Sequence, residues 1–285
     1  MSRILVVDDD RTTRHVLKKV LTGAGFTTRV ARDGVEALST LRKARFDLLL
    51  LDVWMPRMNG LDLLVRLRAR KKRPRVVVMT SDDAPETLLK AVREQAFKYV
   101  HKPVESAALL RTVREVLRAP EAPPVEVISA KPEWVELVVP CTREAAERIQ
   151  LVMTGLDADL AADIRESIAY AFRELLLNAV EWGGRLDPQR KVRISYLRAR
   201  RMLLYRIADP GSGFQIENLP HAAIGQSSDN PIEHMQVREE KGIRPGGFGL
   251  LMVRASVDEL LYNEKRNEVV FVKYLDDALK VRAGS

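Results

Sequence analysis

The chain has 285 residues, of which 46% are hydrophobic and 30% charged. This length is typical of two domains, and this composition of soluble domains with buried cores. No apolar run approaches the roughly 20 residues of a membrane helix, and no apolar secretory segment opens the chain, so we expect a cytoplasmic protein without membrane contact. The single cysteine, Cys141, excludes an internal disulfide and is interpreted as a small core residue.

The net charge of +8 comes from the first part of the chain. Of the 47 Lys and Arg and 39 Asp and Glu, residues 1–118 hold 25 and 14, a local charge of +11, and the remainder carries −3. Much of the excess lies in the run 66–75, which could bind phosphates, an acidic partner or DNA. We interpret it as a helix end, where cations suit the negative end of the helix dipole. No aromatic platform or recognition-helix pattern supports nucleic acid as a partner.

Short apolar runs alternate with amphipathic stretches in residues 1–118. We expect strands over 3–8, 26–31, 46–52, 75–80 and 97–101, and helices over 11–22, 34–44, 60–69, 85–95 and 104–118. This alternation predicts a doubly wound α/β domain with a five-stranded parallel sheet that is buried on both faces. Residues 119–132 are rich in proline and are predicted to be a linker.

The second predicted domain, residues 133–280, has its strands and helices in blocks. We expect strands over 136–139, 191–197, 202–208, 259–263 and 268–274, and helices over 143–156, 160–182 and 248–258. Residues 215–246 are polar and show no periodicity. This order predicts an α+β sandwich.

Three carboxylates follow predicted strands of the first domain. Asp8 and Asp9 follow the first strand, and Asp52 ends the third. In doubly wound sheets the carboxyl ends of adjacent strands form the binding crevice. Carboxylates that converge there repel unless a hard cation such as Mg²⁺ neutralises them, and one of them can then accept a phosphoryl group. Thr80, at the end of the fourth strand, could donate a hydrogen bond to that group, and Lys102, after the fifth, could supply a cation.

Together these motifs resemble the receiver domains of response regulators over all of residues 1–118. The acidic pair, the loop 52–60, Thr80 with its following serine, and Lys102 with its following proline all match in order. The resemblance implies that Asp52 takes a phosphoryl group from a cognate histidine kinase. It also implies that the acidic pair, Asp52 and the backbone carbonyl of Trp54 hold Mg²⁺, and that Tyr99 swings inward on activation.

A second group of polar residues lies on the long predicted helix of the second domain. Glu174 and Asn178 are four residues apart and therefore share one helix face. The carboxylate could act as a general base, and the amide oxygen could bind Mg²⁺. Such a pair also occurs by chance on many helices, so on its own it is weak evidence for a nucleotide site.

Two glycine motifs follow this helix. Asp209, Gly211 and Gly213 come after an apolar strand, where glycines let the backbone approach a flat base and the carboxylate can accept from an exocyclic amine. Gly247 and Gly249 open a predicted helix, whose free N–H groups suit a phosphate. Each motif alone could equally be a turn.

In this order the three motifs resemble the GHKL ATPase superfamily over about residues 133–276, and within it the anti-sigma-factor kinases through 172–183 and 247–260. The resemblance implies that residues 215–246 form the ATP lid. It also implies that Glu174 is the base, Asn178 a Mg²⁺ ligand and Asp209 the adenine anchor. By the same resemblance, Gly247 and Gly249 contact the phosphates. Relatives often have His-Gly where this chain has Trp182-Gly183.

The leading hypothesis is a receiver-controlled serine/threonine kinase that uses ATP and Mg²⁺. By resemblance, its substrate is an anti-anti-sigma protein, and its second partner is a sigma factor. The sequence leaves open whether the protein forms a homodimer. A non-catalytic, ATP-dependent partner switch is an alternative that the sequence hardly separates from the kinase. A histidine autokinase needs an acceptor histidine before the ATPase domain, and none of the four histidines lies between the domains: His15, His101, His221 and His234.

Overall fold

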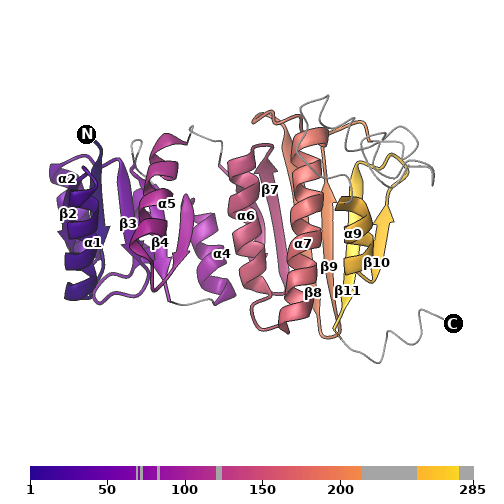
Figure 1. Cartoon of the computed structure of the whole chain (residues 1–285), viewed down its shortest axis with the longest axis horizontal. Coiled ribbons are helices and arrows are strands. Elements are labelled where there is room, and N and C mark those ends of the chain that lie inside the picture. The colour runs from indigo at the N-terminus through magenta and orange to yellow at the C-terminus, as the bar shows by residue number, and fades with distance from the viewer. Residues whose placement is uncertain (69, 71–72, 82–83, 120–123, 214–248, 276–285) are drawn as a thin grey trace. The chain divides into compact units, whose positions relative to one another are not determined.

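The computed structural model describes residues 1–68, 70, 73–81, 84–119, 124–213 and 249–275 (Figure 1). The chain divides into two compact units, Met1–Glu121 and Ala122–Ser285. The predicted lid over 215–246, Gly247 and the last five residues of the predicted second domain lie outside the described residues. Within the described ranges, no helix combines the length and the apolar character that crossing a bilayer requires.

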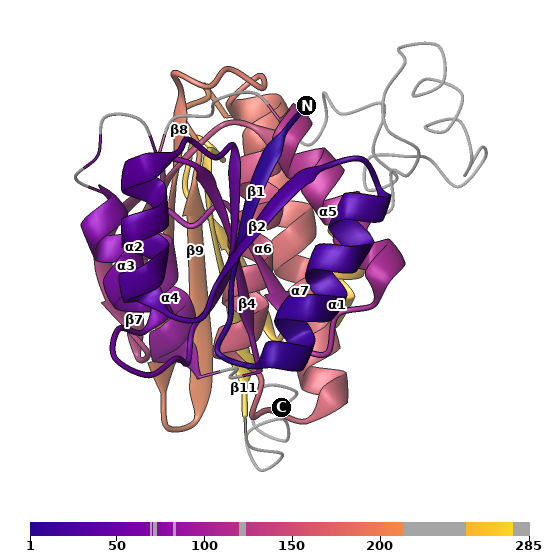
Figure 2. The ribbon, with the colours of Figure 1, turned by 90° about the vertical axis from the view of Figure 1, so that its left-hand side faces the viewer.

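The first unit is the predicted doubly wound domain. Its parallel sheet has the order β2-β1-β3-β4-β5, with strands at Arg3–Val7 (β1), Thr27–Ala31 (β2), Leu48–Asp52 (β3), Arg75–Thr80 (β4) and Lys98–His101 (β5). Figure 2 shows α1 and α5 on one face of the sheet and α2, α3 and α4 on the other. These helices span Arg11–Gly23 (α1), Gly34–Lys43 (α2), Gly60–Arg68 (α3), Pro85–Arg93 (α4) and Ser106–Arg118 (α5).

Burial of both sheet faces explains why the central strands are apolar throughout. Ile4 and Val6 of β1 lie in one core cluster, whereas Leu5 and Val7 lie in the other, because successive side chains of a strand point to opposite faces. All four are fully buried. The two clusters hold the sheet between its two helix layers, so the carboxyl ends of its strands are placed rigidly.

Three arginines of the basic run 66–75 donate hydrogen bonds to carbonyls at helix ends. Arg70 donates to a carbonyl in the last turn of α2 (3.3 Å), Arg73 to two carbonyls just after α4 (3.2 and 3.4 Å), and Arg75 to two carbonyls at the end of α5. The last carbonyls of a helix lack partners within the helix, and cations suit its C-terminal end. These three arginines therefore contact the ends of other helices, whereas the sequence predicted only the solvated end of one helix.

The second unit is an antiparallel sheet of order β10-β11-β9-β8-β7-β6 with helices packed on it (Figure 1). Its strands are Glu126–Lys131 (β6), Trp134–Pro140 (β7), Lys191–Ala199 (β8), Met202–Ala208 (β9), Glu259–Tyr262 (β10) and Glu268–Tyr274 (β11). Its helices are Arg143–Leu156 (α6), Ala162–Asn178 (α7), Gly249–Ser256 (α9) and the π-helical turn Ala179–Gly183 (η1). This is the predicted α+β arrangement.

Two predicted segments differ from the structure. The second half of the predicted linker 119–132 is strand β6, which pairs with β7 at the edge of the sheet. Pro124 and Pro132 lie just outside this strand, where the missing N–H of proline breaks no ladder hydrogen bond. The predicted helix over 160–182 is α-helical only to Asn178 and continues as η1.

A cluster of aromatic side chains around Tyr205 packs α7 against the sheet. The ring of Tyr205 on β9 lies 5.2 Å from that of Phe172 on α7 and 4.8 Å from that of Phe271 on β11. Asp157, at the end of α6, accepts hydrogen bonds from the hydroxyls of Tyr196 (2.9 Å) and Tyr205 (2.5 Å). Burial raises the pKa of Asp157, although both tyrosine hydrogen bonds act to lower it. Phe172 is two residues before Glu174, so this core sets where the predicted site residues of α7 point.

Cys141 is a core residue, as predicted. Its side chain is buried, and a Cβ built on Gly184 would lie 2.2 Å from its sulfur. Burial raises the pKa of the thiol to about 11. A thiol of this kind is protonated at neutral pH and is a weak nucleophile.

Candidate functional site

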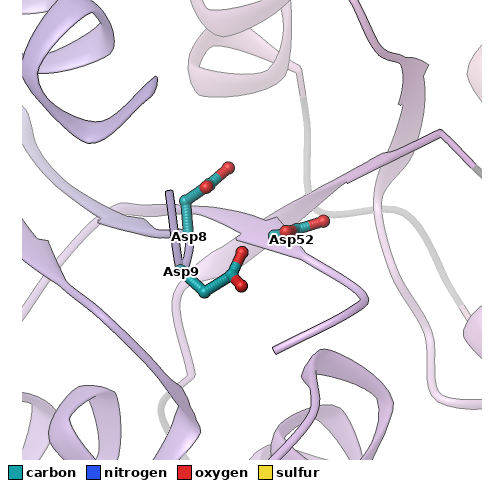
Figure 3. A group of neighbouring side chains, drawn as sticks. All are labelled: Asp8, Asp9 and Asp52. Carbon is teal, nitrogen blue, oxygen red and sulfur yellow. The ribbon is translucent and has the colours of Figure 1, made fainter. Parts of the chain in front are cut away.

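The predicted acidic cluster of the first domain forms at the carboxyl ends of two neighbouring strands. Asp8 and Asp9 follow β1, and Asp52 is the last residue of β3, which pairs with β1 in parallel. Each of the three offers a carboxylate oxygen, and these oxygens lie within 4.8 Å of one another (Figure 3). Asp8 and Asp52 are buried, whereas Asp9 is exposed. Three oxygen donors at this spacing, open to solvent on one side, fit a hard divalent cation.

Lys102 neutralises part of this cluster. Its ammonium nitrogen lies 2.8 Å from Asp8 and 3.0 Å from Asp52. Burial raises the pKa of Asp52, and the negative charges of Asp8 and Asp9 add to this, while Lys102 opposes it. Burial would lower the pKa of Lys102, but its hydrogen bonds to the two carboxylates outweigh that effect and raise it. Thr80 is buried at the end of β4, and its carbonyl accepts from the backbone N–H of Lys102 at 2.8 Å.

The loop after Asp52 turns back on itself. The backbone N–H of Gly60 donates to the carbonyl of Val53 at 2.8 Å, and a Cβ at Gly60 would lie 2.1 Å from the carbonyl oxygen of Asp52. Only glycine allows this approach. The side chain of Trp54 is 55% exposed, and Tyr99 on β5 packs against the core of the domain.

Arg14 is a site residue that sequence reasoning missed. Its guanidinium donates to the carbonyl of Asp8 at 2.6 Å and to that of Asp9 at 2.7 Å. Asp10 caps α1 by accepting from the N–H of Thr13 at 2.6 Å, which places Arg14 on the first turn facing back toward the acidic pair. An arginine one helical turn after an acidic pair is the signal that could have revealed it.

The predicted residues of the second domain line a single cavity of about 490 Å³. Its walls come from α7, η1, the loop after β9, the start of α9 and the turn between β10 and β11. Six of the seven predicted residues lie in this wall: Glu174, Asn178, Asp209, Gly211, Gly213 and Gly249. The seventh, Gly247, lies outside the described residues.

Asp209 lines this cavity, and a backbone hydrogen bond holds one of its carboxylate oxygens. Its Oδ1 accepts from the backbone N–H of Gly211 at 2.7 Å. A Cβ at Gly183 would lie 2.2 Å from the same oxygen, so η1 approaches Asp209 as closely as a glycine allows. Burial raises the pKa of Asp209, against the hydrogen bond from Gly211 and the charge of Arg190.

Glu174 and Asn178 line the same cavity from α7. A Cβ at Gly249, the first residue of α9, would lie 2.2 Å from Oε1 of Glu174. Asn178 is the last α-helical residue before η1, and Trp182 within η1 also lines the cavity. π-Helical turns are uncommon and are often found at functional sites, where they redirect side chains.

Asn267 is a second residue that sequence reasoning missed. Its side-chain amide donates to the backbone carbonyls of Asp209 (3.4 Å) and Gly211 (3.2 Å). The backbone carbonyl of Asn267 accepts from the backbone N–H of Asp209 at 2.9 Å. The turn before β11 thereby braces the loop that carries Asp209. An asparagine in a hairpin turn is so common that the sequence alone does not single it out.

Two family models match the chain. A model for the response regulator receiver domain matches residues 4–114, and one for the histidine kinase-like ATPase domain matches residues 128–273. The predicted resemblances to a receiver and to this class of ATPase are both confirmed.

Named relatives and solved structures also match. The DNA-binding response regulator MtrA of Mycolicibacterium smegmatis is 37% identical over 202 residues, which cover 70% of this chain and 87% of the relative. Response regulator MprA of Mycobacterium ulcerans is 37% identical over 157 residues, or 53% of this chain and 68% of the relative. The chemotaxis response regulator CheY4 of Vibrio cholerae is 32% identical over 41% of this chain and 98% of its own, with a TM-score of 0.39.

Proposed function

Since the chain belongs to the response regulators through its receiver domain and to the histidine kinase-like ATPases through its second domain, we propose that it is a receiver-controlled, ATP-dependent protein kinase that acts on serine or threonine. The chain is a response regulator whose receiver domain is followed by a kinase-like ATPase domain as its output. The MtrA relatives are named DNA-binding response regulators, so their output differs from the ATPase domain of this chain. The kinase activity, its substrate and its control are the proposal.

In the receiver, Asp52 is the phosphoacceptor. Its carboxylate attacks the phosphorus of a phosphohistidine on a cognate histidine kinase, the P–N bond breaks, and the histidine leaves. A Mg²⁺ held by Asp8, Asp9, Asp52 and the carbonyl of Trp54 would offset charge on the phosphoryl oxygens when bound. Lys102 already contacts Asp52 and can follow the new phosphoryl group.

The observation that carries the ATPase proposal is that Asp209, Glu174 and Asn178 face one cavity of about 490 Å³. Ligand pockets have volumes on the order of 300–1,000 Å³, so a nucleotide fits. Asp209 would accept from the adenine amine with its second oxygen. Asn178 would hold Mg²⁺, which supplies positive charge at the phosphates, and Glu174 would take the proton of the substrate hydroxyl.

The partners follow from the same proposal. A histidine kinase would phosphorylate the receiver, and the ATPase domain would phosphorylate an anti-anti-sigma protein. A sigma factor would be the second partner of the ATPase domain. An ATP-dependent switch that binds its partner without phosphorylating it is the alternative, because Trp182 lines the cavity where related kinases often have histidine.

The test is a phosphotransfer assay with the full chain. ATP and Mg²⁺ are added with candidate anti-anti-sigma proteins of the host, and any phosphoserine or phosphothreonine is mapped by mass spectrometry. Transfer that is lost in Glu174→Gln, while calorimetry shows retained ATP binding, supports the kinase. ATP binding with partner capture but no transfer supports the switch. If calorimetry detects no ATP binding at all, both proposals for the second domain fail.

A further inference from the structure

The loop between β3 and α3 is anchored at Arg57, five residues after the predicted phosphoacceptor Asp52. Arg57, in the middle of this loop, has a φ of 65°, the left-handed conformation that favours glycine. Its guanidinium pairs with Oδ2 of Asp33, whose side chain is only 1% exposed. A strained residue that is held by a buried partner points to a functional constraint, because such strain persists only where the surroundings enforce it.

Asp33 is fixed from the other side. Its Oδ1 accepts from the backbone N–H groups of Val35 and Glu36, both at 2.9 Å, and so caps α2. The next residue strengthens the connection, since the N–H of Gly34 donates to the carbonyl of Met58 at 3.1 Å. The loop is therefore held to the start of α2 at residues 57 and 58.

Its other anchor is Gly60, which packs on the carbonyl of Asp52 and donates to that of Val53. Trp54 lies in the chain between Val53, whose carbonyl accepts from Gly60, and the anchor at Arg57. Its backbone carbonyl is the predicted cation ligand, and its exposed side chain is two residues from Asp52. Releasing the anchor at Arg57 would free the part of the loop that carries this carbonyl.

We propose that Arg57 is a positioning residue of the receiver: by pairing with Asp33 it keeps the carbonyl of Trp54 in place, and so sets the affinity of the site for Mg²⁺ and the lifetime of the aspartyl phosphate. The part on lifetime rests on Asp52 being phosphorylated. In the hydrolysis step, a water oxygen attacks phosphorus and the bond between phosphorus and the Asp52 oxygen breaks. Inorganic phosphate leaves with the oxygen and both protons of the water, one of which can pass to solvent, and the carboxylate is restored.

The test measures Mg²⁺ binding by the fluorescence of Trp54, in the full chain with Trp134→Phe and Trp182→Phe so that Trp54 is the single reporter. Arg57→Gly removes the cation but suits the left-handed backbone, which isolates the ion pair from the strain. We expect it to weaken Mg²⁺ on the order of tenfold, the usual effect of losing support behind a metal ligand. Arg57→Lys should restore part of this affinity.

Two further variants make the test specific. Asp33→Asn still caps α2, because asparagine is a good N-cap, but loses the charge that holds Arg57, and should match Arg57→Gly. Combined, the two changes should be no worse than either alone, since both remove one interaction. Arg32→Ala is the matched control: Arg32 lies 3.9 Å from the same carboxylate but outside the loop, and its removal should leave Mg²⁺ affinity unchanged.

Lifetime is measured separately, at saturating Mg²⁺ after labelling with acetyl phosphate, and should shorten severalfold in Arg57→Gly and Asp33→Asn. Wild-type Mg²⁺ affinity and lifetime in a folded Arg57→Gly protein would overturn the inference, and so would an equal loss in Arg32→Ala. If the wild-type chain itself takes no label, the phosphoacceptor proposal fails, while the Mg²⁺ measurement still decides the role of Arg57.

Discussion

Gly249 at the start of α9 lies directly against the carboxylate of Glu174 on α7, since a Cβ at this glycine would lie 2.2 Å from Oε1. Any larger residue must push the carboxylate aside. Because the obstructing atom is the end of a flexible side chain, the protein can adapt without unfolding. The glycine therefore controls where the predicted base points.

We expect Gly249→Ala to fold and to bind ATP, but to lose phosphotransfer by about 100-fold, as displacements of about 1 Å can do. The assay is the phosphotransfer reaction described above, with melting temperature and ATP affinity as controls. Gly23→Ala is the matched control, because a Cβ there meets nothing within 4 Å. Normal transfer by Gly249→Ala would show that Glu174 is not the base or need not hold this position.

Gly60→Ala should behave differently, because its obstacle is backbone. The new Cβ would lie 2.1 Å from the carbonyl oxygen of Asp52, so the loop or β3 itself must shift. Overpacking of this kind costs about 1–3 kcal/mol. We expect a lower melting temperature of the receiver and a loss of acid-labile label from acetyl phosphate. A variant with wild-type melting and labelling would contradict the close packing that we describe.

The acidic cluster could be predicted from the sequence, because its geometry follows from the topology of the sheet. Neighbouring parallel strands bring Asp8 and Asp52 to the same sheet edge, whatever the side-chain details are. The sequence was not sufficient for β6, because an edge strand between prolines looks like a linker. It also could not assign the cap by Arg75, whose acceptor carbonyls are 41 and 44 residues away in the chain.

In the ATPase domain, the sequence identified the residues of the cavity but not what holds them. Asp209 and Asn178 stand in recognisable motifs. Asn267 acts through its amide hydrogen bonds to a loop 56 and 58 residues away, which no local pattern records. The π-helical turn after Asn178 was also missed, because helical periodicity continues through it.

ATP affinity should depend on pH through Asp209. Burial raises the pKa of this carboxyl above 3.8, and the ionised form is the one that accepts from the adenine amine. As pH falls through the raised pKa, the site is protonated and affinity is lost. At neutral pH, Asp209→Asn should cost about 1.5–3 kcal/mol of binding, the usual value of a hydrogen bond to a charged group.

The measurement for Asp209 is the ratio of wild-type to Asp209→Asn affinity across pH, by calorimetry. Titration of the ATP phosphates cancels in this ratio, because both proteins bind the same ligand. We expect the ratio to approach one at low pH and to rise to a plateau above the raised pKa. A ratio that is independent of pH would mean that Asp209 does not contact the base as an ionised acceptor.

The last prediction concerns the link between the two sites. Helix α5 of the receiver ends at Arg118, and strand β6 of the ATPase sheet begins at Glu126, so a short proline-rich segment joins them. Arg75 at the start of β4 holds the last turn of α5 through two carbonyls. A change at Thr80, the other end of β4, therefore lies on the strand that supports the end of α5.

We expect beryllofluoride, which mimics the phosphoryl group on Asp52, to change ATP affinity by about 5–150-fold, the usual range of coupling between linked sites. Thr80→Ala should abolish this change, because the methyl side chain offers the phosphoryl group no hydrogen bond. Arg75→Gln should reduce it while leaving ATP affinity without beryllofluoride unaltered, since the cavity is intact. By reciprocity, saturating ATP should change beryllofluoride affinity by the same factor. Equal ATP affinities with and without beryllofluoride in the wild-type protein would show that the receiver acts on something other than nucleotide binding, such as partner access or assembly.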